Sequence, residues 1–89
     1  MFTIIFPVLN ERLRLESGVT RTVEYLQSIA FEDYEIIIVD NGSEDETPQI
    51  AEKLCKKYDK VRYERINVRG VGAAFRRGVE VSHGDVVGY

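Results

Sequence analysis

The sequence is poor in cysteine and in positive charge, and each shortage excludes a class of protein. The single cysteine, Cys55, rules out an internal disulfide framework and a Cys-rich zinc site, and it fits a reducing, intracellular compartment. The 12 Lys and Arg residues stand against 15 Asp and Glu residues, so the net charge is −3. Proteins that bind nucleic acid need a surplus of positive charge on one face. We therefore expect no nucleic-acid partner.

Long apolar runs are also missing. The longest apolar stretches are about four or five residues, far shorter than the ~20 residues that cross a bilayer. Residues 1–10 lack the basic start and the cleavage site of a signal peptide. We expect a cytoplasmic protein whose full-length form could lie at the cytoplasmic face of a membrane. The 89 residues, 44% of them hydrophobic, are typical of a single folded domain over residues 1–89.

Four short apolar runs predict β-strands. Residues 1–6, "MFTIIF", and residues 34–40, "YEIIIVD", are continuous runs typical of strands buried on both faces, and we expect Pro7 to end the first. Residues 61–66, "VRYERI", alternate apolar and charged side chains, which predicts a strand at a sheet edge. An open edge of this kind is a template for pairing, so a homodimer could form through it. Residues 86–89, "VVGY", predict the last strand.

Three helices are expected between these strands. Apolar residues spaced by three and four predict the first over residues 13–30. Its buried face is expected to comprise Val19, Thr22, Val23, Leu26, Ile29 and Ala30. Thr47 before Pro48 predicts the start of the second, with the Thr47 hydroxyl capping free N–H groups. A third, over residues 73–82, is interrupted by Gly78 at a cost of about 1 kcal/mol relative to Ala.

The order β-α-β-α-β-α-β predicts an α/β fold, a Rossmann-like three-layer sandwich around a mostly parallel four-stranded sheet. Ligands bind such sheets at the carboxyl ends of the strands. After the first strand, "PVLNE" offers free backbone groups to a planar ligand, and Glu11 suits a pair of ribose hydroxyls. After the second, Asp40 and Asn41 can engage a base, since a carboxylate accepts hydrogen bonds whereas an amide donates and accepts.

The third strand is followed by "NVRGVG", residues 67–72, a glycine-bearing loop that leads into a helix. Such a loop can present N–H groups to a phosphate, with Arg69 as the counter-charge. It is not the dinucleotide-binding fingerprint G-x-G-x-x-G, because Phe75 occupies the third glycine position, and no Walker motif occurs. A dinucleotide-dependent oxidoreductase is therefore disfavoured.

The turn after the second strand also has a purely structural interpretation. Gly42 and Ser43 can close a strand-to-helix turn, with Asp45 and Glu46 stabilised near the positive start of the following helix. Cys55 lies on the apolar face of its helix and is expected to be a small core residue. His83 is expected to be a surface turn residue.

Four segments taken together resemble a known family. "FPVLNE", "IIIVDNGSEDET", "NVRGVGAAFRRG" and "SHGDVV" have the order and spacing of the first half of a family-2 inverting glycosyltransferase of the GT-A fold. The likeness is greatest to dolichyl-phosphate sugar synthases. It implies an enzyme that moves a sugar from a nucleotide diphosphate sugar, carrying UDP or GDP, to a polyprenyl (dolichyl) phosphate.

The resemblance also implies roles for individual residues. The nucleotide-sugar-binding set it implies is Pro7, Val8, Leu9, Glu11, Asp40, Asn41, Arg69 and Gly70. Where this chain has Asn41, many members carry a second acid, so the choice between UDP and GDP stays open. The family's Asp-x-Asp motif, which holds Mg²⁺ or Mn²⁺, and its catalytic base come after the fourth strand. We therefore expect a truncated, inactive fragment with no catalytic or metal-binding residue of its own.

One alternative from another class remains. A non-catalytic nucleotide-binding or regulatory module of flavodoxin-like or receiver-like shape would show the same alternation of strands and helices. A receiver needs paired acids after its first strand and an Asp after its third, and here these positions carry "PVLNE" and "NVRG".

Overall fold

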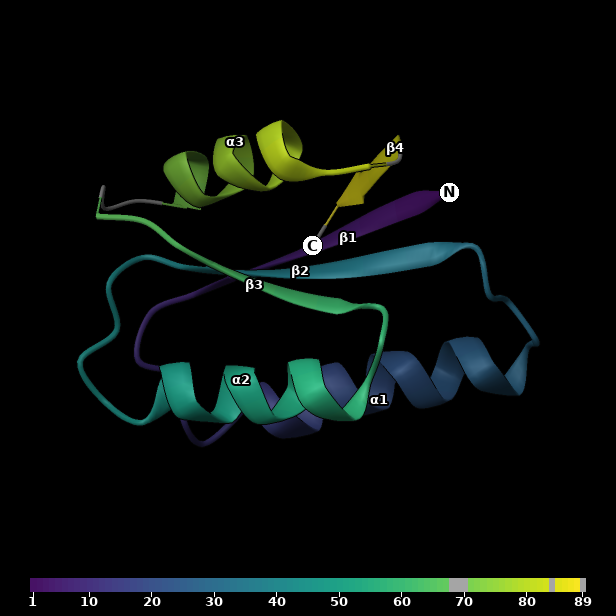
Figure 1. Cartoon of the computed structure of the whole chain (residues 1–89), viewed down its shortest axis with the longest axis horizontal. Helices are drawn as coiled ribbons and strands as arrows, with labels where there is room; N and C mark the ends of the chain where they lie inside the picture. Colours follow the sequence, from purple (N-terminus) through teal and green to yellow (C-terminus); the bar gives the residue numbers. More distant parts are fainter. Residues whose placement is uncertain (68–70, 84, 89) are drawn as a thin grey trace.

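The computed structural model describes residues 1–67, 71–83 and 85–88 of the chain. Strands and helices alternate in the predicted order (Figure 1): β1 (Phe2–Val8), α1 (Leu15–Ser28), β2 (Tyr34–Asp40), α2 (Thr47–Lys57), β3 (Val61–Arg65), α3 (Val71–Val81) and β4 (Asp85–Gly88). None of the helices in these ranges has the length and apolar character needed to cross a membrane.

The strands form one parallel sheet in the order β3-β2-β1-β4. The chain builds β1, β2 and β3 towards one edge and then passes back over the sheet to place β4 on the other side of β1. The strand order therefore reverses between β1 and β4, the position at which open parallel sheets bind ligands. Helices α1 and α2 cover one face and α3 covers the other (Figure 1), so the predicted three-layer α/β sandwich is confirmed.

Strand β2 is buried along its whole length because both of its faces are covered. Side chains alternate across a strand. Ile36 and Ile38 thus join the larger core beneath α1 and α2, whereas Ile37 and Val39 join the smaller core beneath α3. Burying one such side chain contributes about 1.5 to 3 kcal/mol. The apolar run therefore fixes the position of Asp40 at its end.

The prediction that Pro7 ends the first strand is wrong, because β1 continues to Val8. Successive residues of a strand direct their N–H and C=O groups to opposite sides. The Val8 carbonyl accepts the Asn41 N–H on the β2 side at 2.9 Å, so the nitrogen of Pro7 faces the β4 side. The described part of β4 pairs with Phe2, Thr3 and Ile4, short of Pro7. The proline therefore removes no hydrogen bond from these pairings.

Helix α1 is shorter than predicted. It ends at Ser28, and Ile29 is 54% exposed rather than part of the buried face. The chain leaves the helix through Ala30, whose φ of 56° is left-handed, while the Phe31 N–H donates to the Leu26 carbonyl at 2.9 Å. This is the Schellman arrangement, which usually has glycine at the left-handed position. An alanine there gives no warning of the helix end in the sequence.

Strand β3 forms one edge of the sheet, as predicted from its alternating pattern. Its side chains are partly exposed beyond Val61, and Arg62, Glu64 and Arg65 are charged. Charged side chains on an edge strand oppose pairing with a second sheet. A homodimer through this edge stays a prediction.

A buried carboxylate, Glu35, joins several elements near the start of β2, at the amino-terminal end of the sheet. It is 5% exposed, and its oxygens accept hydrogen bonds from the Thr3 hydroxyl at 2.7 Å, the His83 N–H at 2.6 Å and the Arg62 guanidinium at 3.0 Å. Burial raises the pKa of Glu35, but these three hydrogen bonds and the Arg62 charge outweigh burial and lower it. The His83 side chain is exposed beside this group, as expected for a turn residue.

Helix α3 makes its close approach to β1 at Gly78. A Cβ atom at this position would lie 2.5 Å from Cδ1 and 2.7 Å from Cγ1 of Ile5, which is fully buried. The sequence indicates a cost in helix propensity at Gly78, and the structure shows what the glycine provides. The missing side chain leaves the space that Ile5 fills.

We predict that Gly78→Ala lowers the free energy of unfolding by about 1 to 2 kcal/mol. Overpacking a core costs about 1 to 3 kcal/mol, more than the gain of at most about 1 kcal/mol in helix propensity. The matched control is Gly18→Ala in α1, where the new Cβ would make an ordinary contact with Phe6 at 3.6 Å. Urea unfolding should show the control to be as stable as the wild-type chain or more so, and a stabilised Gly78→Ala variant would contradict the prediction.

We also predict that Glu35 contributes to acid unfolding. The pKa of Glu35 is lower in the folded state, so ionised Glu35 stabilises the fold at any pH above its ordinary pKa of 4.5. This contribution is lost as the pH falls through the lowered pKa of the folded state. Urea unfolding from about pH 5 to about pH 3 should show a smaller loss of stability for Glu35→Gln than for the wild-type chain. The exposed carboxylate Glu24 provides the control, Glu24→Gln. Equal slopes for all three proteins would be the contrary result.

Candidate functional site

Two loops at the carboxyl ends of β1 and β2 are bonded to each other through short polar side chains. The β1–α1 loop comprises residues 9–14, and the β2–α2 loop comprises residues 41–46. Three N–H groups of the first loop donate to side chains that follow β2: Asn10 to Ser43 Oγ at 2.8 Å, Glu11 to Thr47 Oγ1 at 2.9 Å and Arg12 to Asp45 Oδ2 at 3.3 Å. The Glu44 N–H donates in return to Asn10 Oδ1 at 2.8 Å. The two loops are therefore one structural unit.

This arrangement corrects one prediction and confirms another. The Thr47 hydroxyl accepts the Glu11 N–H of the β1–α1 loop, and Thr47 is itself the first residue of α2, so its predicted capping role is wrong. Asp45 does lie at the helix start, where its Oδ1 accepts the Thr47 N–H at 2.9 Å. Asn10 has a left-handed φ of 53°, a conformation that asparagine tolerates better than most residues.

Asp40 ends β2 as a fully buried carboxylate that accepts four hydrogen bonds. Its Oδ1 accepts the N–H groups of Gly42 at 3.0 Å and Ser43 at 2.7 Å, which closes the turn after β2. Its Oδ2 accepts the Tyr63 hydroxyl at 2.7 Å and an Arg65 guanidinium N–H at 3.3 Å. Both oxygens are thus used within the protein. Asp40 organises the strand end, and its predicted contact with a base stays a prediction.

Tyr63 and Arg65 reach this strand end from β3, and the sequence interpretation missed both. Arg65 pairs with Asp40 in the sheet register, and it also donates to the Ser43 carbonyl at 3.0 Å. Burial, with the hydrogen bond to Asp40 next, raises the pKa of Tyr63 to about 12. The tyrosine is therefore a hydroxyl donor at any physiological pH. The signal available in the sequence was the alternation in "VRYERI", which places both side chains on one face, but the register that brings this face to Asp40 is set by the fold.

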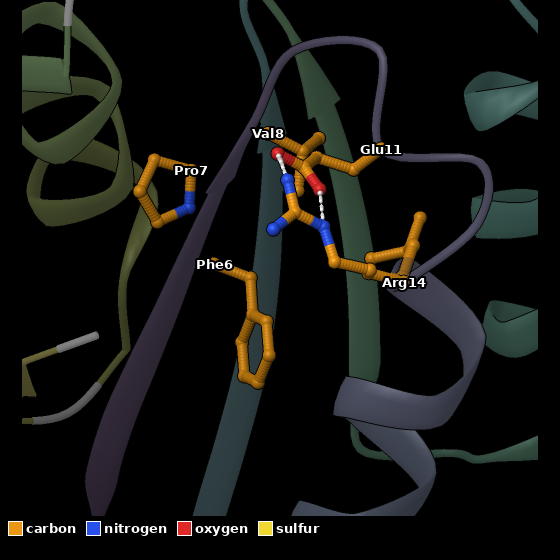
Figure 2. A pocket seen from close by; sticks show the side chains of 6 residues that line it. Phe6, Pro7, Val8, Glu11 and Arg14 are labelled. Carbon is orange, nitrogen blue, oxygen red and sulfur yellow. Dashed lines mark hydrogen bonds and ion pairs between the residues drawn. The ribbon is translucent and has the colours of Figure 1, made fainter.

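A pocket of about 280 Å³ opens beside the end of β1 (Figure 2). Its lining residues are Phe6, Pro7, Val8, Glu11, Arg14 and Leu15. Figure 2 shows the Pro7 ring and the Phe6 ring on opposite sides of the strand, with the Glu11 carboxylate close to Val8. Sites for small ligands usually measure about 300 to 1,000 Å³. This pocket is therefore suited to one part of a larger ligand.

The Glu11 carboxylate at this pocket is held by Arg14. Its two oxygens accept Arg14 N–H groups at 2.8 and 2.9 Å, which gives a two-point ion pair (Figure 2). The Arg14 side chain is 79% exposed, and exposed ion pairs contribute about 0 to 1 kcal/mol. A ligand with two adjacent hydroxyls could therefore displace Arg14 at little cost.

The other predicted site residues fall into three groups. Asn41 is 6% exposed and lies next to Val8, whose carbonyl accepts its N–H at 2.9 Å. Leu9 follows β1 directly and is 37% exposed. Arg69 and Gly70 lie outside the described residues. The fold thus brings Pro7, Val8, Glu11, Asp40 and Asn41 to one end of the sheet.

A metal site in this region would need several His, Cys, Asp or Glu side chains close together. Nowhere in the described ranges do three or more His, Cys, Asp or Glu residues gather so that they could hold a metal ion. Two of the acids in the β2–α2 loop are engaged within the protein, Asp45 by N–H groups and Glu46 by Arg12 at 3.6 Å. We therefore assign no described residue to a metal. Mg²⁺ or Mn²⁺ in a full-length protein stays a prediction.

Comparison with known proteins shows one consistent family. Residues 3–89 match the family model described as Glycosyl transferase family 2. Glycosyltransferase AglD of Haloferax volcanii is 36% identical over 89 residues, which cover 98% of this chain and 14% of AglD. Dolichyl-phosphate beta-glucosyltransferase of Mus musculus is 39% identical over 92 residues, which cover 96% of this chain and 28% of the enzyme.

A solved structure gives the same result. The structure of S. aureus TarS 1-349 in complex with UDP matches with a TM-score of 0.70 and 25% identity, covering 99% of this chain and 26% of that one. The chain therefore spans less than a third of the length of these proteins.

We predict that Asp40→Asn lowers the free energy of unfolding by about 2 to 4 kcal/mol. The amide keeps the size of the side chain, but its NH₂ group must face either the N–H groups of the turn or the donors from β3, which leaves buried donors unpaired. The control is Asp33→Asn, the same chemical change at a side chain that is 73% exposed, which should change stability by about 0.5 kcal/mol or less. Thermal or urea unfolding measures both, and similar values would show that the carboxylate is dispensable.

Proposed function

The chain belongs to glycosyl transferase family 2, and we propose from this that it binds the nucleotide part of a nucleotide diphosphate sugar at the carboxyl ends of β1 and β2. The observation that carries the proposal is the pocket beside β1, whose lining includes Val8 and the Glu11 carboxylate. The Val8 carbonyl in turn accepts the Asn41 N–H, which joins the pocket wall to the turn after β2. The pocket lies near the point where the strand order reverses, as ligand sites do in this class of sheet.

Each part of the proposed ligand has a chemical counterpart at this site. A nucleobase presents N–H and C=O groups along one edge, and the Asn41 amide can donate and accept at once while it keeps a partner within the protein. Phe6 and Val8, which share one side of β1, provide an apolar wall for the ring face, and Pro7 is proposed to contact the nucleotide from the other side of the strand. The Asp40 carboxylate, which is fully used by the protein, acts in this proposal through the turn that it holds. Leu9 is proposed to contact the base or ribose, and Arg69 and Gly70 are proposed to bind the diphosphate.

The ribose is assigned to Glu11. A carboxylate binds a pair of neighbouring hydroxyls through its two oxygens, and both oxygens now accept from Arg14. Ribose binding therefore exchanges one two-point interaction for another. The cost of the exchange is small because Arg14 is mostly exposed and can return to water.

The donor and acceptor follow by analogy with the relatives. UDP is present in the TarS complex, and the name of the mouse relative states a dolichyl-phosphate acceptor and a glucosyl group. We therefore propose a UDP- or GDP-sugar as the donor and a polyprenyl phosphate as the acceptor of the complete enzyme. Within the 89 residues we assign nucleotide binding and no sugar transfer.

We predict that the chain binds UDP or GDP with a micromolar or weaker dissociation constant, and equally well with or without Mg²⁺, because the base and ribose contacts do not involve a metal. Isothermal titration calorimetry with UDP, GDP, NAD and FMN measures this. Glu11→Gln should weaken binding of the preferred nucleotide about fivefold to tenfold, since an amide offers one acceptor in place of two. The 2′-deoxy form of the same nucleotide should bind Glu11→Gln as well as it binds the wild-type chain, because it lacks one of the two hydroxyls.

The matched control for this experiment is Glu16→Gln, which makes the same change on the first turn of α1. Binding of NAD or FMN in place of UDP and GDP would favour the flavodoxin-like alternative and overturn the proposed function. Unchanged binding by Glu11→Gln would leave nucleotide binding intact and remove only the ribose assignment.

A further inference from the structure

We propose that Tyr63 and Arg65 on the edge strand β3 are positioning residues that set base selectivity, because they hold the turn carrying Asn41 through the buried carboxylate of Asp40. This role rests on the proposed function, since it concerns the turn assigned above to the base. Neither residue belongs to the set that lines the pocket at β1.

The two oxygens of the Asp40 carboxylate bind different parts of the protein. Oδ1 accepts the two N–H groups that define the turn, from Gly42 and Ser43. Oδ2 accepts from Tyr63 and Arg65 at 2.7 and 3.3 Å. The carboxylate is planar, so fixing Oδ2 fixes the direction of Oδ1 and with it the turn. Without the β3 donors the group could rotate about its Cβ–Cγ bond, a broad torsion in carboxylates.

This turn carries Asn41, which connects it to the proposed ligand. Asn41 lies between Asp40 and Gly42, so its backbone is fixed on both sides by groups that the carboxylate organises. Arg65 strengthens the restraint, since it also donates to the Ser43 carbonyl at 3.0 Å on the far side of the turn. The Ile66 N–H donates to the Asp40 carbonyl at 2.8 Å, which holds the backbone of β3 to the same residue.

The hydrogen bonds from Tyr63 and Arg65 to Asp40 are strong ones. The pair Asp40 and Arg65 joins a fully buried carboxylate to a guanidinium that is 43% exposed, so one partner is shielded from solvent. Hydrogen bonds to a buried charge contribute more than those between neutral groups. Tyr63 adds a donor that brings no charge of its own. The sheet pairing of β3 with β2 ends at Asp40. The side chains of β3 therefore restrain a turn that lies beyond this pairing.

The test measures base selectivity rather than stability alone. The dissociation constants of UDP and GDP are determined for the wild-type chain, Tyr63→Phe and Arg65→Gln, at a temperature at which each protein is folded. We expect the ratio of the two constants to move towards unity by about threefold to tenfold in each variant, which corresponds to the loss of one hydrogen bond to the carboxylate. Amide hydrogen exchange at Gly42 and Ser43 should accelerate relative to the amides of α1.

The control is Tyr25→Phe, which removes a hydroxyl from a tyrosine on α1 that is 63% exposed. It should leave both the ratio and the exchange rates unchanged. If Tyr63→Phe melts earlier but keeps the wild-type ratio and slow exchange at Gly42 and Ser43, Tyr63 is structural only and the positioning role is contradicted. If the wild-type chain binds neither UDP nor GDP, or binds them without preference, the proposed base site fails first and this role fails with it.

Discussion

The buried carboxylate of Asp40 is the interaction on which the carboxyl end of the sheet depends. An unpaired charge in a protein interior costs several kcal/mol, so a fully buried Asp is compatible with folding if donors surround it. Here the donors come from two separate elements, the turn after β2 and the side chains of β3. The carboxylate therefore couples the geometry of the turn to the correct docking of the edge strand.

The loops that follow β1 and β2 are ordered by the same kind of bond on a smaller scale. Neither loop has regular secondary structure, yet their N–H groups need acceptors wherever water is excluded. Asn10, Ser43, Thr47 and Asp45 supply these acceptors across the gap between the loops. The pocket beside β1 thus lies against a loop that is bonded to the loop after β2, and Val8 in its lining is itself bonded to Asn41 of that turn.

The sequence was informative where one residue type has one physical use. The run "IIIV" indicates a strand covered on both faces, and the polar residues after it mark the carboxyl end of the sheet. The sequence was misleading where a residue has several uses. Pro7 predicts a strand end unless the pairing of β4 is known. Thr47 predicts a helix cap unless the neighbouring loop is known. Ala30 gives no sign of a helix end.

The site was predictable to the same extent. Pro7, Val8, Glu11, Asp40 and Asn41 do lie together, because parallel strands place their carboxyl ends at one edge. What the sequence could not supply was the partner of each charge. Asp40 is satisfied by Tyr63 and Arg65 through a register that no local pattern encodes, and Glu11 pairs with Arg14, three residues further along the same loop. The bonds to Asp40 follow from the assembled sheet, whereas the pair of Glu11 and Arg14 is local. The charge at Asp40 serves the fold, and Asn41 beside it places an uncharged amide rather than a second negative charge in the buried turn.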